Sequence, residues 1–135
     1  MNKYLNPKEY NILNMIFHSE EPLSASQLIK IQPELTVNIV QPAIRKLLKL
    51  KLIEVADISI DGNVLARRFQ STADAPDIIE KMFMDDYLRF KRLISGQSLF
   101  SALLRADHRP NDAQNEIAEL EQLLDEYKKK TDKNR

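Results

Sequence analysis

The hydrophobic period of this sequence changes from helical to alternating near Leu52, and this change constrains the fold more than any other feature. Before it, three segments begin at capping residues, and their apolar residues recur every three or four positions. After it, apolar residues alternate over 53–60, a turn follows over 61–63, and a second strand-like run occupies 64–69. The pattern predicts three helices followed by a β-hairpin.

The starts of the three helices are marked by side chains that can accept hydrogen bonds from free backbone N–H groups. Asn6, followed by Pro7, begins the first helix, while Ser24 begins the second and Thr36 the third. Pro33 separates the second helix from the third. The third helix is expected to bury one side, which consists of Val37, Val40, Ile44, Leu47 and Leu48.

This order of elements is that of a winged helix-turn-helix, in which the third helix enters the DNA major groove and the hairpin forms a wing. The predicted fold class is mainly α (α+β), with a winged helix-turn-helix N-terminal domain over 1–73 and a small all-helical C-terminal dimerisation domain over 74–135. In the second domain we expect a helix that ends at Gly96, a short helix over 98–105 and a last helix over 112–130.

The polar side of the third helix carries groups that can read DNA. Asn38, Gln41 and Arg45 supply the amides and guanidinium that match base edges in the major groove. The alternative is that this stripe is only the solvated face of an amphipathic helix, which is the commoner case, but the hairpin directly after it favours DNA. The basic residues expected to hold phosphates are Lys46, Lys49, Arg67 and Arg68.

The chain has 20 Lys and Arg against 20 Asp and Glu, and a net charge of zero by itself argues against nucleic-acid binding. The distribution of charge along the chain changes this interpretation. Segment 1–73 has nine basic and seven acidic residues, and segment 74–135 has eleven and thirteen. Between Thr36 and Gln70, six basic residues face three acidic ones. This local excess, doubled in a dimer, predicts modest nonspecific binding that depends more on base readout and dimer geometry than on bulk charge.

Several other classes of protein are disfavoured. No apolar stretch approaches the roughly 18 residues of a membrane span, the first ten residues lack a secretory pattern, and the chain has no cysteine. His18 and His108 lie in different halves without carboxylates at ligand spacing, and Asp85-Asp86 point in different directions on a helix. We therefore expect a soluble cytoplasmic protein that is not an enzyme and uses no cofactor, no metal and no membrane.

The last helix carries an apolar stripe at alternating spacings of three and four residues, Ile117, Leu120, Leu124 and Tyr127. This stripe could pack on the chain's own fourth helix. The helices after Asp74 each have few apolar residues and no sheet to pack on, which favours completion of a core by a second copy in a homodimer. A homodimer would place two recognition helices about 34 Å apart on a palindromic site. The predicted dimerisation residues are Ile79, Phe83, Leu99, Phe100, Leu103, Ile117, Leu120, Leu124 and Tyr127.

Four segments in this order, LTVN at 35–38, IRKLLK at 44–49, LIEV at 52–55 and IAELEQLL at 117–124, resemble the penicillinase-repressor (BlaI/MecI/CopY) family of bacterial transcription regulators. The resemblance implies a homodimeric winged-helix repressor that binds a palindromic double-stranded DNA operator. Its recognition-helix contacts fall here at Asn38, Gln41, Pro42 and Arg45. The full predicted set of DNA-binding residues is Thr36, Asn38, Gln41, Pro42, Arg45, Lys46, Lys49, Asn63, Arg67 and Arg68.

Three features depart from that family. Pro42 in the third helix lacks an N–H and crowds the carbonyl of Asn38, at a cost of about 3 kcal/mol, so we expect a kink or a late helix start. The Asn-Phe dipeptide at which a membrane metalloprotease cuts some members is absent, with Ala102-Leu103 in its place, so a regulatory protease stays an open question. Copper sensing through thiolates is excluded because there is no cysteine. A winged-helix protein-interaction module remains the alternative function.

Overall fold

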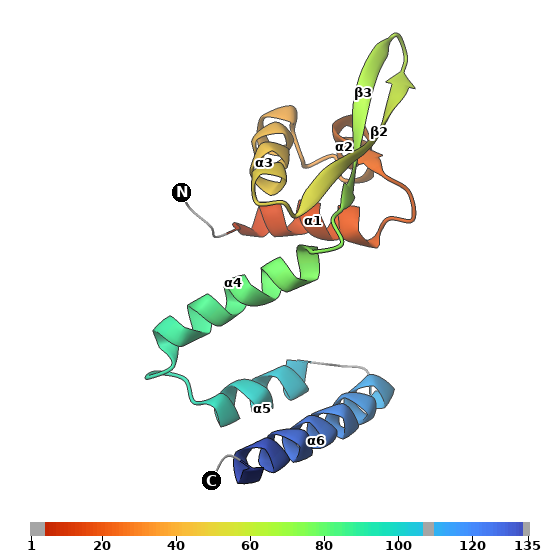
Figure 1. The fold of residues 1–135 in the computed structure, drawn as a ribbon. Coiled ribbons are helices and arrows are strands. Elements are labelled where there is room, and N and C mark those ends of the chain that lie inside the picture. The colour runs from red at the N-terminus through yellow and green to blue at the C-terminus, as the bar shows by residue number, and fades with distance from the viewer. Residues whose placement is uncertain (1–4, 107–109, 134–135) are drawn as a thin grey trace. The chain divides into compact units, whose positions relative to one another are not determined.

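The computed structural model describes residues 5–106 and 110–133 and confirms the winged helix-turn-helix fold (Figure 1). Its elements are α1 (Pro7–His18), β1 (Leu23–Ser24), α2 (Ala25–Ile31), α3 (Val37–Lys49), β2 (Ile53–Asp61), β3 (Val64–Ser71), α4 (Ala75–Phe90), α5 (Gly96–Ala106) and α6 (Pro110–Lys133). The chain divides into two compact units, Met1–Asp86 and Tyr87–Arg135. This division lies inside α4, whereas the boundary predicted at 73/74 precedes that helix.

Two of the three predicted caps form reciprocal hydrogen bonds. The Asn6 side chain accepts from the backbone N–H of Glu9 at 2.8 Å, and the Glu9 carboxylate accepts from the backbone N–H of Asn6 at 2.8 Å. Ser24 and Gln27 make the same pair of bonds at the start of α2. Each box satisfies two of the N–H groups that a helix start leaves free, so local chemistry fixes where these helices begin. Thr36 is the N-cap of α3 but makes no such side-chain bond.

The hydrophobic core of the first unit lies where α1, α2 and α3 meet the sheet. The largest fully buried side chains are Ile12, Leu28, Val40, Ile44, Leu47, Leu52 and Ile53. They come from three helices and from the first residues of the hairpin, and each fully buried aliphatic side chain contributes about 1.5–3 kcal/mol. This core fixes α3 against α1 and α2 while leaving the opposite side of α3 to solvent.

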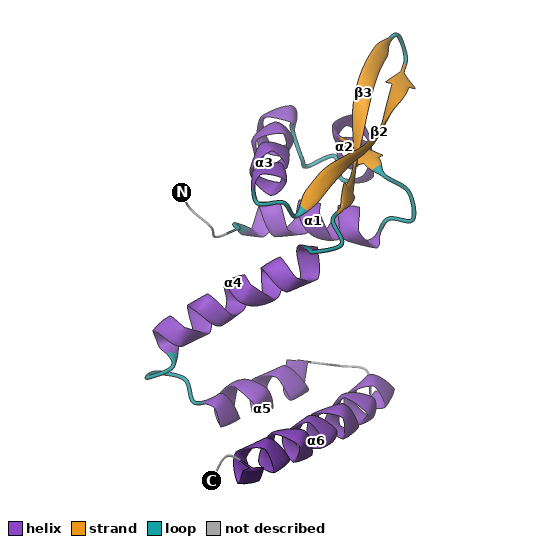
Figure 2. Ribbon diagram, viewed as in Figure 1, coloured by secondary structure: helices purple, strands orange, loops and turns teal. Residues whose placement is uncertain are grey.

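The sheet has three antiparallel strands in the order β1-β3-β2, shown in orange in Figure 2. The predicted hairpin is confirmed, and its two-residue loop begins with Gly62 at φ +67°, a backbone angle that strongly favours glycine. Strand β1 was not predicted, since two residues are too few to show a period. Leu23 and Ser24 pair with Phe69 and Arg68, which ties the hairpin to the start of α2.

Helix α3 runs without interruption from Val37 to Lys49, with Pro42 inside it. The predicted late start is therefore wrong. Asn38, whose carbonyl loses its N–H partner at Pro42, is exposed, and so is Pro42 itself. Water can take the place of the missing donor, which reduces the cost of an interior proline at this position.

Two predicted boundaries in the C-terminal part are also wrong. Helix α4 ends at Phe90, whose carbonyl accepts from Leu93 and Ile94 in a closing turn, and Gly96 begins α5 instead of ending α4. The Ser95 hydroxyl accepts from the backbone N–H of Ser98 at 3.1 Å, as an N-cap does. Helix α6 continues to Lys133, beyond its predicted end.

The second unit contains no buried side chain among residues 87–106 and 114–131, whose side chains the structure describes. Among these described side chains of α5 and α6, only Gly96, Leu99, Leu104 and Leu120 are half-buried. Apolar residues such as Phe100 and Leu124 are 52% and 57% exposed. This unit therefore lacks a hydrophobic core of its own within the described residues.

Candidate nucleic-acid interface

The exposed side of α3 carries the polar residues that the sequence predicted for base readout. Asn38, Gln41 and Arg45 are all exposed. On the buried side of the same helix, Val40 and Leu47 are fully enclosed by the core. Since i, i+3 and i+7 positions share a face, the three polar side chains form one continuous stripe. Their exposure is required for DNA contact, but their role in base readout stays a prediction.

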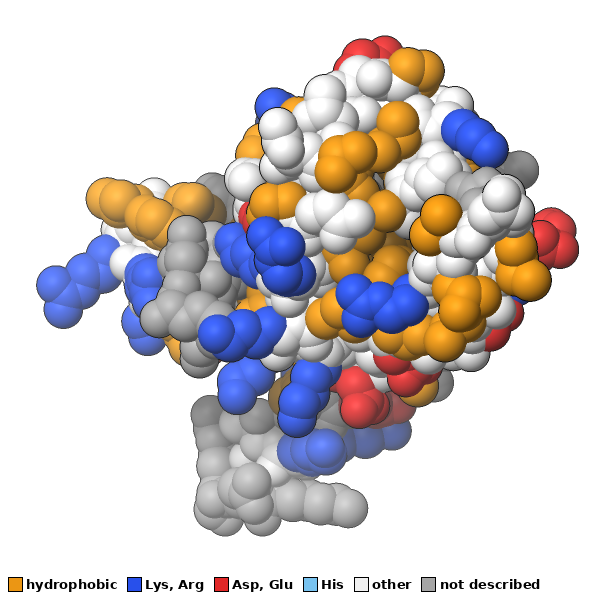
Figure 3. Space-filling view, turned by 90° about the horizontal axis from the view of Figure 1, so that it is seen from above, with side chains coloured by type: hydrophobic (Ala, Val, Ile, Leu, Met, Phe, Trp, Pro, Cys, Tyr) orange, Lys and Arg blue, Asp and Glu red, His pale blue; other side chains and the backbone are white. Residues whose placement is uncertain are grey.

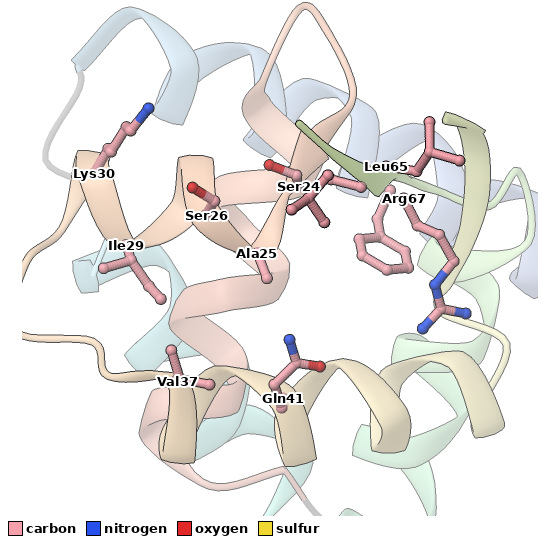
Figure 4. Close-up of a pocket in the computed structure, with 12 residues that line it drawn as sticks. Ser24, Ala25, Ser26, Ile29, Lys30, Val37, Gln41, Leu65 and Arg67 are labelled. Atoms are coloured by element: carbon pink, nitrogen blue, oxygen red, sulfur yellow. The ribbon is translucent and has the colours of Figure 1, made fainter. Parts of the chain in front are cut away.

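Gln41 of this stripe lines a groove of about 610 Å³ between α2, α3 and β3. Figure 4 shows Val37 and Gln41 of α3 on one side, α2 on the opposite side, and Leu65 and Arg67 of β3 at one end. The buried Phe69 ring forms part of its floor. The groove is lined by Ser24, Ala25, Ser26, Ile29, Lys30, Val37, Gln41, Val64, Leu65, Ala66, Arg67 and Phe69.

The two arginines predicted to hold phosphates lie on opposite faces of β3, because side chains alternate along a strand. Arg67 lines the groove, and its guanidinium lies 5.4 Å from the centre of the Phe69 ring. Arg68 instead donates two hydrogen bonds of 2.6 Å to the carboxylate of Asp57, its cross-strand partner on β2. The hydrogen bonds from Arg68 lower the pKa of Asp57, and the same bonds raise the pKa of Arg68.

The remaining predicted phosphate contacts occupy different surroundings. Lys46 is half-buried and forms an ion pair of 3.0 Å with Glu9, the carboxylate that also caps α1. Lys49 at the end of α3 and Asn63 at the hairpin loop are exposed, as is Thr36 before α3. Lys46 therefore positions α3 against α1, whereas the other three side chains are open to a partner.

The groove also contains two polar residues that were not among the predicted DNA contacts. Lys30 and Ser26 of α2 line it together with Gln41 and Arg67. Figure 3 shows Lys and Arg side chains beside hydrophobic ones on the face of the molecule seen in that view. The available signal was a basic residue on the helix before α3, since helix-turn-helix proteins place the corresponding helix across the DNA backbone.

The predicted dimerisation residues occupy two different places. Ile79 packs against the core of the first unit, while Phe83 in the same helix is 60% exposed. In the second unit, α5 and α6 border an apolar groove of about 620 Å³. Its lining residues are Gln97, Phe100, Ser101, Leu104, Ile117, Leu120, Glu121, Leu123, Leu124 and Tyr127. Leu99 and Leu103 of α5 lie outside this set, and Leu103 is exposed.

Residues 5–106 and 110–133 contain no cluster of three or more histidine or acidic side chains that could hold a metal ion. His18 lies in the last turn of α1, with its ring edge-on to Phe17, and His108 lies outside the described residues. Within the same described ranges, no helix combines the length and apolar character needed to cross a membrane.

A scan against protein-family models and a search of curated proteins find no match to this sequence. The resemblance to the penicillinase-repressor family therefore stays a prediction. Among solved structures, two of the adhesin competence repressor AdcR from Streptococcus pyogenes are similar. One has a TM-score of 0.45 and 20% identity over 75% of this chain and 76% of that chain. The other has a TM-score of 0.44 and 18% identity over 93% of this chain and 84% of that chain.

A mutant of MepR from a multidrug resistant S. aureus clinical isolate is also similar, with a TM-score of 0.44 and 17% identity, covering 91% of this chain and 79% of that chain. At identities this low, the functions of these proteins do not transfer to this chain. What this chain does has to be argued from its own exposed groups.

Proposed function

We propose that this protein is a sequence-specific DNA-binding transcriptional repressor that acts as a homodimer on a palindromic operator, as the penicillinase-repressor resemblance implies. The observation that supports the proposal is that a polar residue of α3 and a basic residue of the wing lie at one groove. Gln41 of the exposed polar stripe on α3 and Arg67 of strand β3 in the wing line the same groove. A major groove about 12 Å wide accepts one such helix.

The proposed contacts divide by chemistry. Asn38, Gln41 and Arg45 read base edges, since amides and guanidinium groups form bidentate hydrogen bonds with purines. Lys49 and Arg67 hold phosphates, which position the protein without reading sequence. Arg68 and Lys46 have a structural role instead, because Arg68 forms an ion pair with Asp57 and Lys46 forms one with Glu9.

Homodimerisation is supported by the exposed apolar residues of α5 and α6. The described side chains of the second unit include none that is buried, yet its groove gathers Phe100, Ile117 and Leu124. Covering these residues with a second copy would remove apolar surface from water at about 25 cal/mol per Å². A second copy also supplies the two-fold symmetry that a palindromic operator requires.

The test is fluorescence anisotropy with labelled DNA taken from upstream of the protein's own reading frame, measured at several salt concentrations. We expect affinity to fall steeply as salt rises, because phosphate contacts release counterions. Arg45→Gln should cost about 1–3 kcal/mol at one base pair and relax sequence choice there, whereas Arg67→Gln should weaken all sequences and reduce the salt slope. Lys81→Gln removes the same charge from an exposed side chain of α4 and should change neither the sequence choice nor the salt slope.

A winged-helix protein-interaction module is the second candidate, and the wing supplies the observation that favours it. Ile58, Ile60 and Leu65 are 62%, 75% and 72% exposed, more apolar surface than phosphate binding needs. Absence of DNA binding at low salt, or binding without salt dependence, would contradict the repressor proposal and favour this module.

A further inference from the structure

The groove between α2, α3 and β3 has a charge and polarity that DNA contact alone does not explain. Its lining includes the cations Lys30 and Arg67 and no carboxylate. Val37 and Leu65, which also line it, are 59% and 72% exposed, so apolar surface and positive charge share one hollow. A phosphate backbone needs the charge but gains nothing from the apolar walls.

Arg67 is the group best prepared to bind an anion. Its guanidinium is held over the Phe69 ring, and none of the described carboxylates forms an ion pair with it. Arg68 on the opposite face is different, because Asp57 already accepts two of its N–H groups. A guanidinium that lies over an aromatic ring is partly oriented before it binds, and it presents its donors in a planar fork that matches a carboxylate.

The surroundings of Arg67 supply the other parts of a small-molecule site. Figure 4 shows the guanidinium extending toward the α3 side of the groove, where the Gln41 amide lies. Apolar side chains of α2 and α3, Ile29 and Val37, line the space beyond. The volume of about 610 Å³ lies within the range of about 300–1,000 Å³ typical of small-molecule sites.

We propose that this groove binds a small amphipathic organic anion, with a carboxylate at Arg67 and Gln41 and a ring or branched apolar body against Val37 and Leu65. Because the proposed function assigns Gln41 and Arg67 to DNA, the bound anion would exclude DNA from this face. The competition rests on the proposed function, whereas binding of the anion does not. The occupant is thus a regulator that acts directly on the DNA-binding surface.

The first test uses 2-naphthoate and the full chain without DNA. We expect saturable binding by NMR titration, with the largest shifts at residues that line the groove. The neutral 2-naphthamide should bind about fivefold or more weakly because it lacks the charge-assisted bonds, and acetate, which has no apolar body, should not saturate. Arg67→Gln should weaken 2-naphthoate to the level of the amide, and Leu65→Ser should weaken both ring compounds. Lys81→Gln is the charge-matched control.

Equal affinity for 2-naphthoate and 2-naphthamide, equal effects of Arg67→Gln and Lys81→Gln, or shifts confined to α5 and α6 would each overturn the site. In a second arm, 2-naphthoate should raise the apparent Kd for DNA linearly with its free concentration, by a factor of one plus the ratio of that concentration to its own Kd for the groove. Unchanged DNA affinity at saturation would overturn the competition. Failure of the chain to bind DNA at all would overturn the repressor proposal, while the titration without DNA would still decide the anion site.

Discussion

At the residue scale, the alternation of one strand gives two adjacent arginines different surroundings. Arg67 faces the groove and the Phe69 ring, whereas Arg68 faces Asp57 across the hairpin. The sequence shows two basic neighbours and suggests one shared role. The structure separates them, because the register of β2 and β3 decides which residue meets a carboxylate. Arg68 therefore stabilises the wing, and Arg67 stays open to a partner.

The ion pair of Asp57 with Arg68 predicts a pH dependence of stability. Because the pKa of Asp57 is lowered in the folded state, ionised Asp57 adds to the free energy of unfolding above the ordinary aspartate pKa. This stabilisation is lost as the pH falls through the pKa of Asp57 in the folded protein. We expect Asp57→Asn to destabilise the protein at pH 7, with the difference from the unsubstituted chain vanishing well below about pH 4. Urea unfolding of both chains at pH 7 and well below about pH 4 measures the loss of stability and its disappearance.

Asp85→Asn, on the exposed surface of α4, is the control and should show no comparable loss at pH 7. Carboxyl NMR of the folded protein provides an independent check. The Asp57 titration should move up toward the ordinary aspartate range in the Arg68→Gln variant. A midpoint that does not move would show that Arg68 is not the cause of the lowered pKa.

At the element scale, the sequence predicted best where local chemistry decides the structure. Asn6 and Ser24 form the hydrogen bonds of capping boxes, and the loop at Gly62 takes the positive φ expected of a tight hairpin. Strand β1 could not be predicted, since it exists only through pairing with Phe69 and Arg68 far along the chain. The groove was missed for the same reason: its walls come from three elements that only the fold brings together.

Pro42 offers a prediction about helix α3. Pro42→Ala restores an N–H that can donate to the carbonyl of Asn38, so we expect the free energy of unfolding to rise by about 1–3 kcal/mol, less than the full cost of an interior proline because proline also restricts the unfolded chain. Urea unfolding measures the change. The matched control is Pro7→Ala, at the first position of α1, where proline fits and no gain is expected.

Operator preference should be compared in the same pair of variants, because Pro42 lies between Gln41 and Arg45 on the predicted reading face. A change of preferred bases with Pro42→Ala, and none with Pro7→Ala, would support a role for the proline in positioning the stripe. Unchanged stability together with unchanged preference would show that Pro42 matters to neither.

At the scale of the whole molecule, the two units differ in how they bury apolar side chains. The unit Met1–Asp86 encloses a core around Ile44 and Leu52, and its fold follows from that core. The described side chains of the unit Tyr87–Arg135 enclose none. The sequence indicated this difference through the thin apolar stripe of the last helix, but it did not show that α5 and α6 gather their apolar side chains into one groove.

Dimerisation through that groove predicts a change of mass. Sedimentation of the full chain should give a dimer, and Leu124→Asp, which places a carboxylate in the groove, should shift the equilibrium toward monomer by at least about tenfold in Kd. Gln122→Asp puts the same group on the part of α6 outside the groove and should leave the mass unchanged. A chain that is monomeric without any substitution would contradict the homodimer.

The Glu9 carboxylate belongs at once to the start of α1 and, through Lys46, to the helix proposed to read DNA. The Glu9 carboxylate thus helps to fix the orientation of α3 against α1, through a residue nearly forty positions later in the chain. Purification tags and fusion partners joined directly before α1 would crowd this shared contact. Affinities measured on such fusions should be compared with those of a chain tagged elsewhere before any loss of binding is assigned to α3.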